Sequence, residues 1–153
     1  MTRRLYAWLA AAVALLAAGA ALLWFGLYPQ APAIDPDDPS QVVLGERIYA
    51  AHCATCHGAN LEGQPNWMDR KPNGRLPAPP HDVSGHTWHH PDQQLMLITK
   101  KGLSAVVPGY QSDMPAFESV LSDAEIAAVL AFIQSRWPPD TRERQKALTR
   151  ASS

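Results

Sequence analysis

The longest hydrophobic stretch of the chain lies near its N-terminus, where residues 5–28 include no charged side chain. As a helix that rises 1.5 Å per residue, this stretch is about 36 Å long, against roughly 30 Å for the hydrocarbon core of a bilayer. Aromatic residues suited to the membrane interface stand near its two ends, at Trp8, Trp24 and Tyr28. The pattern predicts one transmembrane helix within an anchor that spans residues 1–28.

Two basic residues, Arg3 and Arg4, precede the hydrophobic stretch. Basic flanks stay on the cytoplasmic side, so we expect a cytoplasmic N-terminus and the rest of the chain in the bacterial periplasm. The alternative is a cleavable signal peptide with Ala31-Pro32-Ala33 as its A-x-A site. Its apolar region would exceed the usual length of about 7–15 residues. The sequence therefore favours a retained, single-pass anchor in the inner membrane.

Beyond the anchor, four prolines and three aspartates in residues 29–39 predict a stiff, solvated linker. Helical spacing of apolar residues then recurs in three segments: Gln41 to about Cys53, Asp92 to Lys101, and a last segment that Pro138 and Pro139 end. The side chains expected to be buried are Val43, Leu44, Ile48 and Ala51 in the first segment, Leu95, Leu97 and Ile98 in the second, and Ile126, Val129, Leu130, Ile133 and Trp137 in the third.

Local signals mark the ends of these segments. Ser40 can cap the first, Gly102 ends the second, and Ser122-Asp123-Ala124-Glu125 forms a capping box before the third. Between the first two, Gly58 to Pro91 is a long loop with six prolines and four glycines. The polar tail, residues 139–153, is expected to be a frayed helix or disordered. No strand-like alternation occurs, so we predict an all-α domain over residues 40–138.

The residues with the clearest chemistry are Cys53, Cys56 and His57, which form a C-x-x-C-H motif. Two thiols three residues apart can reach the two vinyl groups on one edge of a porphyrin, and the histidine can then bind its iron. A zinc site would need a second pair of ligands, but the chain has only two cysteines. A thioredoxin-like couple belongs beside a βαβ pattern, which is missing. The motif predicts covalent attachment of haem.

The net charge of the chain excludes few classes of function. Without Arg3 and Arg4 the remaining chain has 11 basic and 14 acidic side chains, a net charge of −3. That imbalance is too small to identify an acidic or basic partner. No basic stripe interleaved with aromatic residues is present, so we do not expect binding of nucleic acid.

Taken with this motif, Ser40 to about Trp137 resembles the class I, mitochondrial-type cytochromes c in their bacterial, membrane-anchored form. Gly45 and Tyr49 match the family's first helix, upstream of the haem motif, and the capped third segment matches its last helix. The resemblance implies a small fold of about three main helices and a long loop around one covalent haem c. It also implies that the last helix crosses the first near Gly45, with Val129 and Phe132 as the contacts.

The resemblance further implies that His57 and a methionine are the axial ligands of the haem iron. Met114 fits best, because it precedes Pro115 and lies 57 residues after His57. Met68 is too close to His57 in sequence, and Met96 is surrounded by apolar residues, as a core residue would be. In this family a proline carbonyl also accepts the Nδ1 proton of the axial histidine. The candidates are Pro77, Pro79 and Pro80.

Four histidines stand within ten residues of the long loop, His81, His86, His89 and His90. They could bind copper or zinc, or supply another axial ligand. We favour a role at the haem edge, beside Trp67 and Trp88, and expect no second functional metal.

The resemblance implies a one-electron carrier whose iron cycles between Fe(II) and Fe(III), not an enzyme. With both axial positions filled, no small-molecule substrate binds the iron. Its partners are then redox proteins of a membrane-linked or periplasmic electron-transfer chain. Two alternatives stay open: a subunit of a dehydrogenase or terminal oxidase complex, and a haem protein whose histidine cluster handles a second metal.

Overall fold

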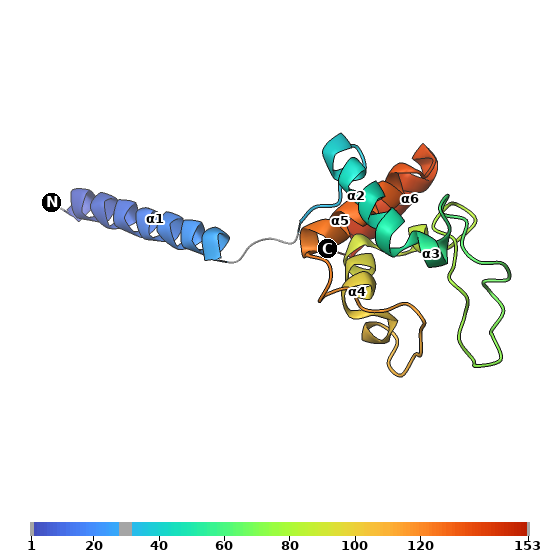
Figure 1. The fold of residues 1–153 in the computed structure, drawn as a ribbon. Helices are drawn as coiled ribbons and strands as arrows, with labels where there is room; N and C mark the ends of the chain where they lie inside the picture. The colour runs from blue at the N-terminus through green and yellow to red at the C-terminus, as the bar shows by residue number, and fades with distance from the viewer. Residues whose placement is uncertain (1, 28–31, 153) are drawn as a thin grey trace. The chain divides into compact units, whose positions relative to one another are not determined.

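The computed structural model of the protein describes residues 2–27 and 32–152 (Figure 1). This described part is all-helical and has no β-strand. The chain divides into an N-terminal unit built from α1 and a second unit that begins at Pro32. The predicted interfacial Tyr28 and the first linker residues, 29–31, lie outside the described residues, as does the side chain of Trp24.

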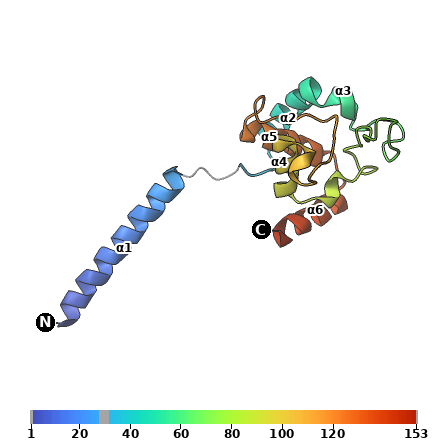
Figure 2. The same ribbon diagram turned by 90° about the horizontal axis from the view of Figure 1, so that it is seen from below.

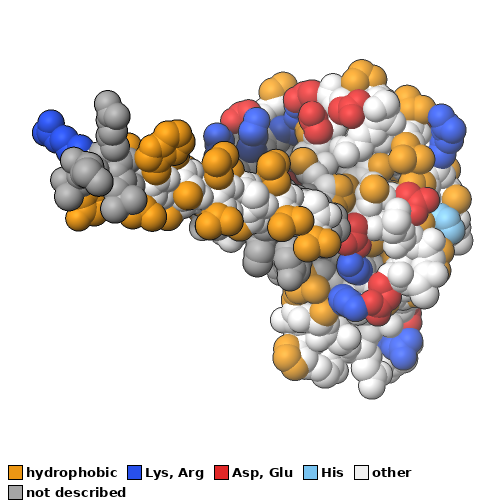
Figure 3. Space-filling model, turned by 90° about the vertical axis from the view of Figure 1, so that its left-hand side faces the viewer, with side chains coloured by type: hydrophobic (Ala, Val, Ile, Leu, Met, Phe, Trp, Pro, Cys, Tyr) orange, Lys and Arg blue, Asp and Glu red, His pale blue; other side chains and the backbone are white. Residues whose placement is uncertain are grey.

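The first unit consists of α1 (Thr2–Leu27). An 18-residue window within it, Tyr6–Leu23, has a mean hydropathy of 2.0. Large apolar side chains such as Trp8 and Leu22 are exposed along it, and Figure 3 shows hydrophobic side chains over the visible face. A helix that exposes apolar side chains in this way is long and apolar enough to cross a bilayer, and a signal sequence would share both properties.

The second unit contains every other helix. These are α2 (Pro39–His52), α3 (Ala54–His57), the short 3₁₀ helix η1 (Thr87–His89), α4 (Asp92–Lys101), a second 3₁₀ helix η2 (Leu103–Ala105), α5 (Asp123–Ser135) and α6 (Pro139–Ala151). Figures 1 and 2 both show the loop after α3 extending away from the helices of this unit.

Capping explains where the main helices begin. The Asp38 carboxylate accepts a hydrogen bond from the backbone N–H of Ser40, so α2 begins two residues before the predicted start, with Pro39 in its first turn. The capping box of α5 is complete: Ser122 accepts from the Glu125 backbone, and Glu125 accepts from the Ser122 backbone. The prediction for the start of α5 is confirmed.

The core lies between α2 and α5, which pack on each other more extensively than any other pair of described elements. A Cβ atom added to Gly45 would lie 1.9 Å from the carbonyl oxygen of Ala128 and 2.9 Å from Cβ of Phe132. The ring of Phe132 also lies 5.3 Å from the ring of Tyr49. The predicted helix crossing is confirmed, with Ala128 rather than Val129 as the closest neighbour of Gly45.

This crossing decides which face of α2 is buried. Gly45, Ile48 and Tyr49 are buried, whereas Val43 is 47% exposed and Leu44 is 41% exposed. The predicted apolar stripe was therefore wrong except at Ile48, because α5 contacts the face that carries the glycine. By contrast, every predicted core residue of α5 and its C-terminal flank is buried. These are Ile126, Val129, Leu130, Ile133 and Trp137.

The buried side of α4 also differs from the prediction. Leu95 and Thr99 are buried, Ile98 is partly buried and Leu97 is 41% exposed. Met96 packs against the core cluster, as expected for a residue that fills space. Near the C-terminal end of α4, the backbone carbonyl of Thr99 accepts a hydrogen bond from the N–H of Phe117 at 3.1 Å, which joins the helix to the segment that carries Phe117.

The polar tail forms a 13-residue helix, α6, where the sequence predicted a frayed helix or disorder. Its buried side is polar: Gln145 is 2% exposed and donates hydrogen bonds to the Asp92 carboxylate at 2.7 Å and to the His90 carbonyl at 3.2 Å. Asp92 also accepts from Gln134 of α5 at 2.7 Å. Because α6 is fixed by hydrogen bonds rather than by an apolar stripe, hydrophobic periodicity could not reveal it.

The close approach at Gly45 gives a test of the helix crossing. Glycine to alanine at an exposed helix position stabilises by up to about 1 kcal/mol, but overpacking a core costs about 1–3 kcal/mol. We expect Gly45→Ala to lower the free energy of unfolding by at least about 1 kcal/mol, measured by urea unfolding of the full chain in detergent. Ala50→Gly, on the exposed side of α2, is the matched control for helix propensity. A Gly45→Ala variant as stable as the wild type would contradict the crossing.

Candidate functional site

The site begins where α2 ends. The N–H of Cys53 donates to the carbonyl of Tyr49 at 2.9 Å, and the N–H groups of Cys56 and His57 both donate to the carbonyl of Cys53, at 3.1 and 2.9 Å. Cys53, as the N-cap, and the short helix α3 therefore place both thiols and the imidazole on one tight turn. Neither cysteine is in a disulfide. Burial, with a smaller contribution from Cys56, raises the pKa of the Cys53 thiol to about 11, so this thiol is protonated at neutral pH.

The imidazole of His57 is buried and held from one side. Its Nδ1 lies 2.8 Å from the carbonyl oxygen of Pro79, which can only accept, so Nδ1 carries the proton. Burial lowers the pKa of His57, an effect that the Pro79 hydrogen bond opposes. The ring is thus neutral at pH 7 and keeps the Nε2 lone pair for a metal. Of the three prolines that the sequence left open, Pro79 has the geometry of the acceptor.

The position of Pro79 depends on a close approach of two backbones. The N–H of Gly63 donates to the carbonyl of His57 at 2.8 Å, and a Cβ atom on Gly63 would lie 2.4 Å from the backbone nitrogen of Pro80. Beside it, the N–H of Gln64 donates to the Ala78 carbonyl, and the Gln64 side chain accepts from the N–H of Ala78. Gly63, with a φ of 68°, allows this pairing, which holds residues 78–80 against His57.

The ring of His81 stacks on the ring of His57, with centroids 4.0 Å apart and planes 23° from parallel. Three contacts fix His81: its N–H donates to the Leu61 carbonyl, its carbonyl accepts from Trp137 Nε1, and its Nδ1 lies 2.8 Å from the hydroxyl of Thr87. Burial lowers the pKa of His81 well below its usual value. The sequence grouped His81 with the other loop histidines, because nothing local to it indicates a partner 24 residues away.

The other loop histidines have separate aromatic neighbours. His86 stacks on Trp67 at 5.4 Å, and His89 stacks on Trp88 at 3.6 Å. His90 meets His86 edge-on at 5.4 Å. Within residues 2–27 and 32–152, no three His, Cys, Asp or Glu side chains are grouped as a metal site would require. His86, His89 and His90 thus contact rings of the loop itself, whereas His81 contacts His57 of α3.

Met114 lies on a separate segment, between η2 and α5. Its N–H donates to the Ser112 hydroxyl at 3.0 Å, and its side chain packs against the core cluster. With Arg75, Gly102 and Tyr110 among others, it lines an open cavity of about 340 Å³. The preceding residue, Asp113, pairs with Arg75 and Lys71, and these two cations hold the pKa of its carboxyl below the usual value.

The other described methionines fit an iron ligand less well. Met68 is 73% exposed, and Met96 packs into the core as a helical residue of α4. Met114 combines a partly buried thioether with a cavity at its side. Its separation from the turn that carries His57 agrees with a ligand that approaches the iron from elsewhere in the fold.

The residues on the α3 turn fit a covalently bound haem. Both thiols are unpaired, and the imidazole is neutral with its Nε2 free of the Pro79 hydrogen bond. Cys56 is exposed and Cys53 is partly buried, so the edge of a bound porphyrin near Cys56 would remain accessible to solvent. A soft thioether and an imidazole are the donor pair of a high-potential iron centre rather than of a zinc or calcium site.

Comparison with known proteins gives two matches. A model of the family described as "Cytochrome c" matches residues 42–137 of the chain. A stretch of 45 residues is 38% identical to the "Cbb3-type cytochrome c oxidase subunit CcoP" of Rubrivivax gelatinosus. That stretch covers 29% of this chain but 15% of the relative, so the similarity spans a small part of that protein. No solved structure gives a significant match.

Proposed function

The chain belongs to the cytochrome c family, and from that membership we propose that it carries single electrons through one covalently bound haem c. Haem-based electron transfer is the function of the family. The finer proposal is that Cys53 and Cys56 form the two thioether bonds and that His57 and Met114 bind the iron from opposite sides. The bound haem would supply the redox chemistry, in which Fe(II) gives up one electron to become Fe(III).

The observation that carries this proposal is the hydrogen bond from His57 Nδ1 to the Pro79 carbonyl. His57 lies on the same turn as both thiols. The hydrogen bond orients the ring, fixes the tautomer and increases the basicity of Nε2. A zinc site would need three or four such ligands together, and in residues 2–27 and 32–152 no three His, Cys, Asp or Glu side chains are grouped to hold a metal. The arrangement instead suits a haem that the two thiols would attach and whose iron His57 would bind.

Met114 completes the proposal as the second axial ligand. A neutral thioether favours Fe(II) over Fe(III) more than a second imidazole does, so we expect a positive reduction potential. With both axial positions occupied the iron has no open coordination site, which favours a carrier over a catalyst. The exposed edge near Cys56 is where redox partners would dock, in small and transient contacts of less than about 1,200 Å².

For the location, we propose that α1 is a retained single-pass anchor in a bacterial inner membrane. Arg3 precedes its apolar window, which supports a cytoplasmic N-terminus and a periplasmic haem domain. The partial similarity to an oxidase subunit favours one second candidate, a subunit of an oxidase complex rather than a free carrier. On the face of the haem domain seen in Figure 3, acidic and basic side chains are mixed, so the charge of this face does not distinguish an oxidase complex from a free redox partner.

The two cysteines give the first test of the proposed function. We expect the full chain purified from its native membrane to have the mass of the polypeptide plus one haem, and to keep that haem through denaturing gel electrophoresis. Cys53→Ala or Cys56→Ala should leave a single thioether bond, and the double variant should lose all covalent haem. Complete extraction of haem from the wild type by acidic acetone would contradict covalent attachment.

The second test concerns Met114. Met114→His should keep a six-coordinate iron but lower its potential, because imidazole favours Fe(III) more than a thioether does. Met114→Ala should open the ferrous iron to carbon monoxide, which the wild type should not bind. The exposed Met68 is the matched control, and Met68→Ala should leave the absorption spectrum and potential unchanged. If Met114→Ala also leaves the absorption spectrum and the reduction potential unchanged, the second ligand lies elsewhere and the histidines of the loop become the first candidates.

The anchor and the partners can be tested in one preparation from native membranes, solubilised in mild detergent. We expect the intact mass to include the N-terminal segment, since its apolar run is too long for a typical signal peptide. A mature chain that begins near Ile34 would show that the segment is cleaved. Stable co-purification with a multi-subunit oxidase would replace the free-carrier proposal with the subunit alternative.

A further inference from the structure

The segment between Gly58 and Pro91 contains η1 as its one described helix, so local polar contacts determine its shape. At its base, the backbone and side chain of Gln64 pair with the backbone of Ala78. At its tip, the N–H of Lys71 donates to the Arg75 carbonyl at 2.9 Å, and the N–H of Gly74 donates to the Lys71 carbonyl at 2.8 Å. These bonds define a loop, residues 64–78, that is closed at both ends.

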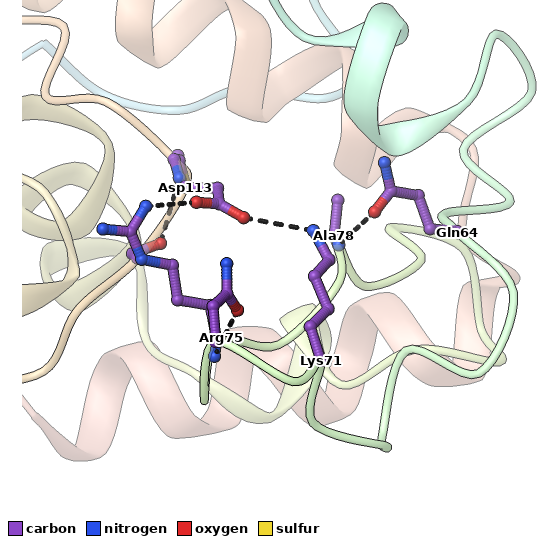
Figure 4. Close-up of polar contacts among 8 residues, drawn as sticks. Gln64, Lys71, Arg75, Ala78 and Asp113 are labelled. Atoms are coloured by element: carbon purple, nitrogen blue, oxygen red, sulfur yellow. Dashed lines mark hydrogen bonds and ion pairs between the residues drawn. The ribbon is translucent and has the colours of Figure 1, made fainter.

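The tip of this loop contacts the segment that carries Met114. Lys71 Nζ lies 3.1 Å from Asp113 Oδ2, and Arg75 Nη1 lies 2.5 Å from Asp113 Oδ1. One carboxylate therefore bridges two cations, one on each of its oxygens. Figure 4 shows the two basic side chains reaching toward Asp113 from the loop, with the Gln64–Ala78 pairing on the other side of the view.

The base of the loop lies next to Pro79, which contacts His57, the other proposed iron ligand. Ala78 directly precedes Pro79, whose carbonyl oxygen accepts from His57 Nδ1. Asp113 directly precedes Met114, and Arg75 lines the same cavity as Met114. Residues 64–80 thus contact the His57 ring at one end and the residue next to Met114 at the other.

Many surface ion pairs have no role beyond a small contribution to stability. All three side chains are partly exposed, 37% for Lys71, 38% for Arg75 and 43% for Asp113, and exposed pairs contribute little stability. Lys100 and Asp123 form a pair of similar exposure, with one cation for one carboxylate. The Asp113 pairs differ in that two cations share one carboxylate. Both cations lie on the loop, 42 and 38 residues before Asp113.

We propose that Asp113 is a positioning residue for Met114. By pairing with Lys71 and Arg75, it ties the methionine segment to the loop whose Pro79 carbonyl orients His57. The inference rests on the proposed role of Met114 as the second iron ligand. Other restraints on the segment lie to either side: the Ser112 hydroxyl accepts from the Met114 N–H, and the Phe117 N–H donates to the Thr99 carbonyl.

With haem bound, these ion pairs would affect how often the Met114 sulfur dissociates from the iron. A thioether is a neutral and weak ligand, so its residence depends on the chain keeping it in place. With haem bound, the Asp113 pairs would limit how far the Met114 segment could move from the iron, so that an external ligand would compete with a thioether that stays nearby. Weakening these pairs should speed the entry of external ligands while leaving the covalent bonds of Cys53 and Cys56 unaffected.

The experiment measures the rate at which imidazole replaces methionine on the ferric, haem-loaded full chain in detergent, together with the weak near-infrared sulfur-to-iron band. We expect Asp113→Asn to raise the rate about threefold to tenfold, as loss of two partly exposed ion pairs would allow. The double variant Lys71→Gln/Arg75→Gln should have the same effect, and adding Asp113→Asn to it should change nothing further. Asp113→Glu should restore much of the wild-type rate.

Salt and a matched variant separate positioning from general stability. Raising the ionic strength should speed the wild type toward the Asp113→Asn rate and leave Asp113→Asn itself unchanged, because salt screens partly exposed charges. Asp123→Asn, which breaks the Lys100 pair, should leave the rate of imidazole binding unchanged whatever it does to unfolding.

Two outcomes would overturn the inference, and they are distinguishable. If the wild type has the sulfur-to-iron band and Asp113→Asn binds imidazole at the wild-type rate, the positioning role is wrong while methionine ligation stands. If the wild type lacks the band and Met114→Ala does not alter the rate, the proposed ligand is wrong and the positioning role falls with it.

Discussion

The hydrogen bond between His57 Nδ1 and the Pro79 carbonyl is the interaction on which the functional structure depends. It turns a histidine at the end of a short helical turn into an oriented, neutral ligand with one free nitrogen. The crossing of α2 and α5 at Gly45 holds that turn from one side. The stacked ring of His81, fixed by Trp137 after the end of α5, supports the imidazole from another. Contacts from segments far apart in the sequence thus hold one ring in place.

The long loop is explained by the same constraint. A loop of this length without regular structure is unusual in a compact domain. Here its base delivers the Pro79 carbonyl to His57, and its tip reaches Asp113 beside Met114. The polar contacts at Gln64 and at the Lys71–Arg75 turn keep the two ends at a fixed separation. A segment that lacks an apolar stripe can therefore still be ordered by a few contacts with defined partners.

The sequence predicted what local chemistry determines. The C-x-x-C-H turn and the capping box at Ser122 each depend on residues close in the chain, and the structure bears out the helix start. The crossing at Gly45 instead involves Ala128 on a distant helix; the resemblance to the cytochromes c implied it, and the structure bears it out. Periodicity misjudged the buried faces of α2 and α4, because the neighbouring element decides which side is covered. It left the tail open between a frayed helix and disorder, because Gln145 of α6 is buried among polar partners rather than in an apolar stripe. The contact between His81 and His57 depends on the folded loop, which the sequence left without structure.

A redox titration of the full chain in detergent, followed by its absorption spectrum, tests whether one haem is held by two protein ligands. We predict a single one-electron transition at a positive potential, with a six-coordinate, low-spin iron in both oxidation states. A high-spin or five-coordinate iron in either state would contradict it, because that iron would have an open position for a substrate. So would the lack of any haem absorption, since no other redox group is implied by the residues on the α3 turn.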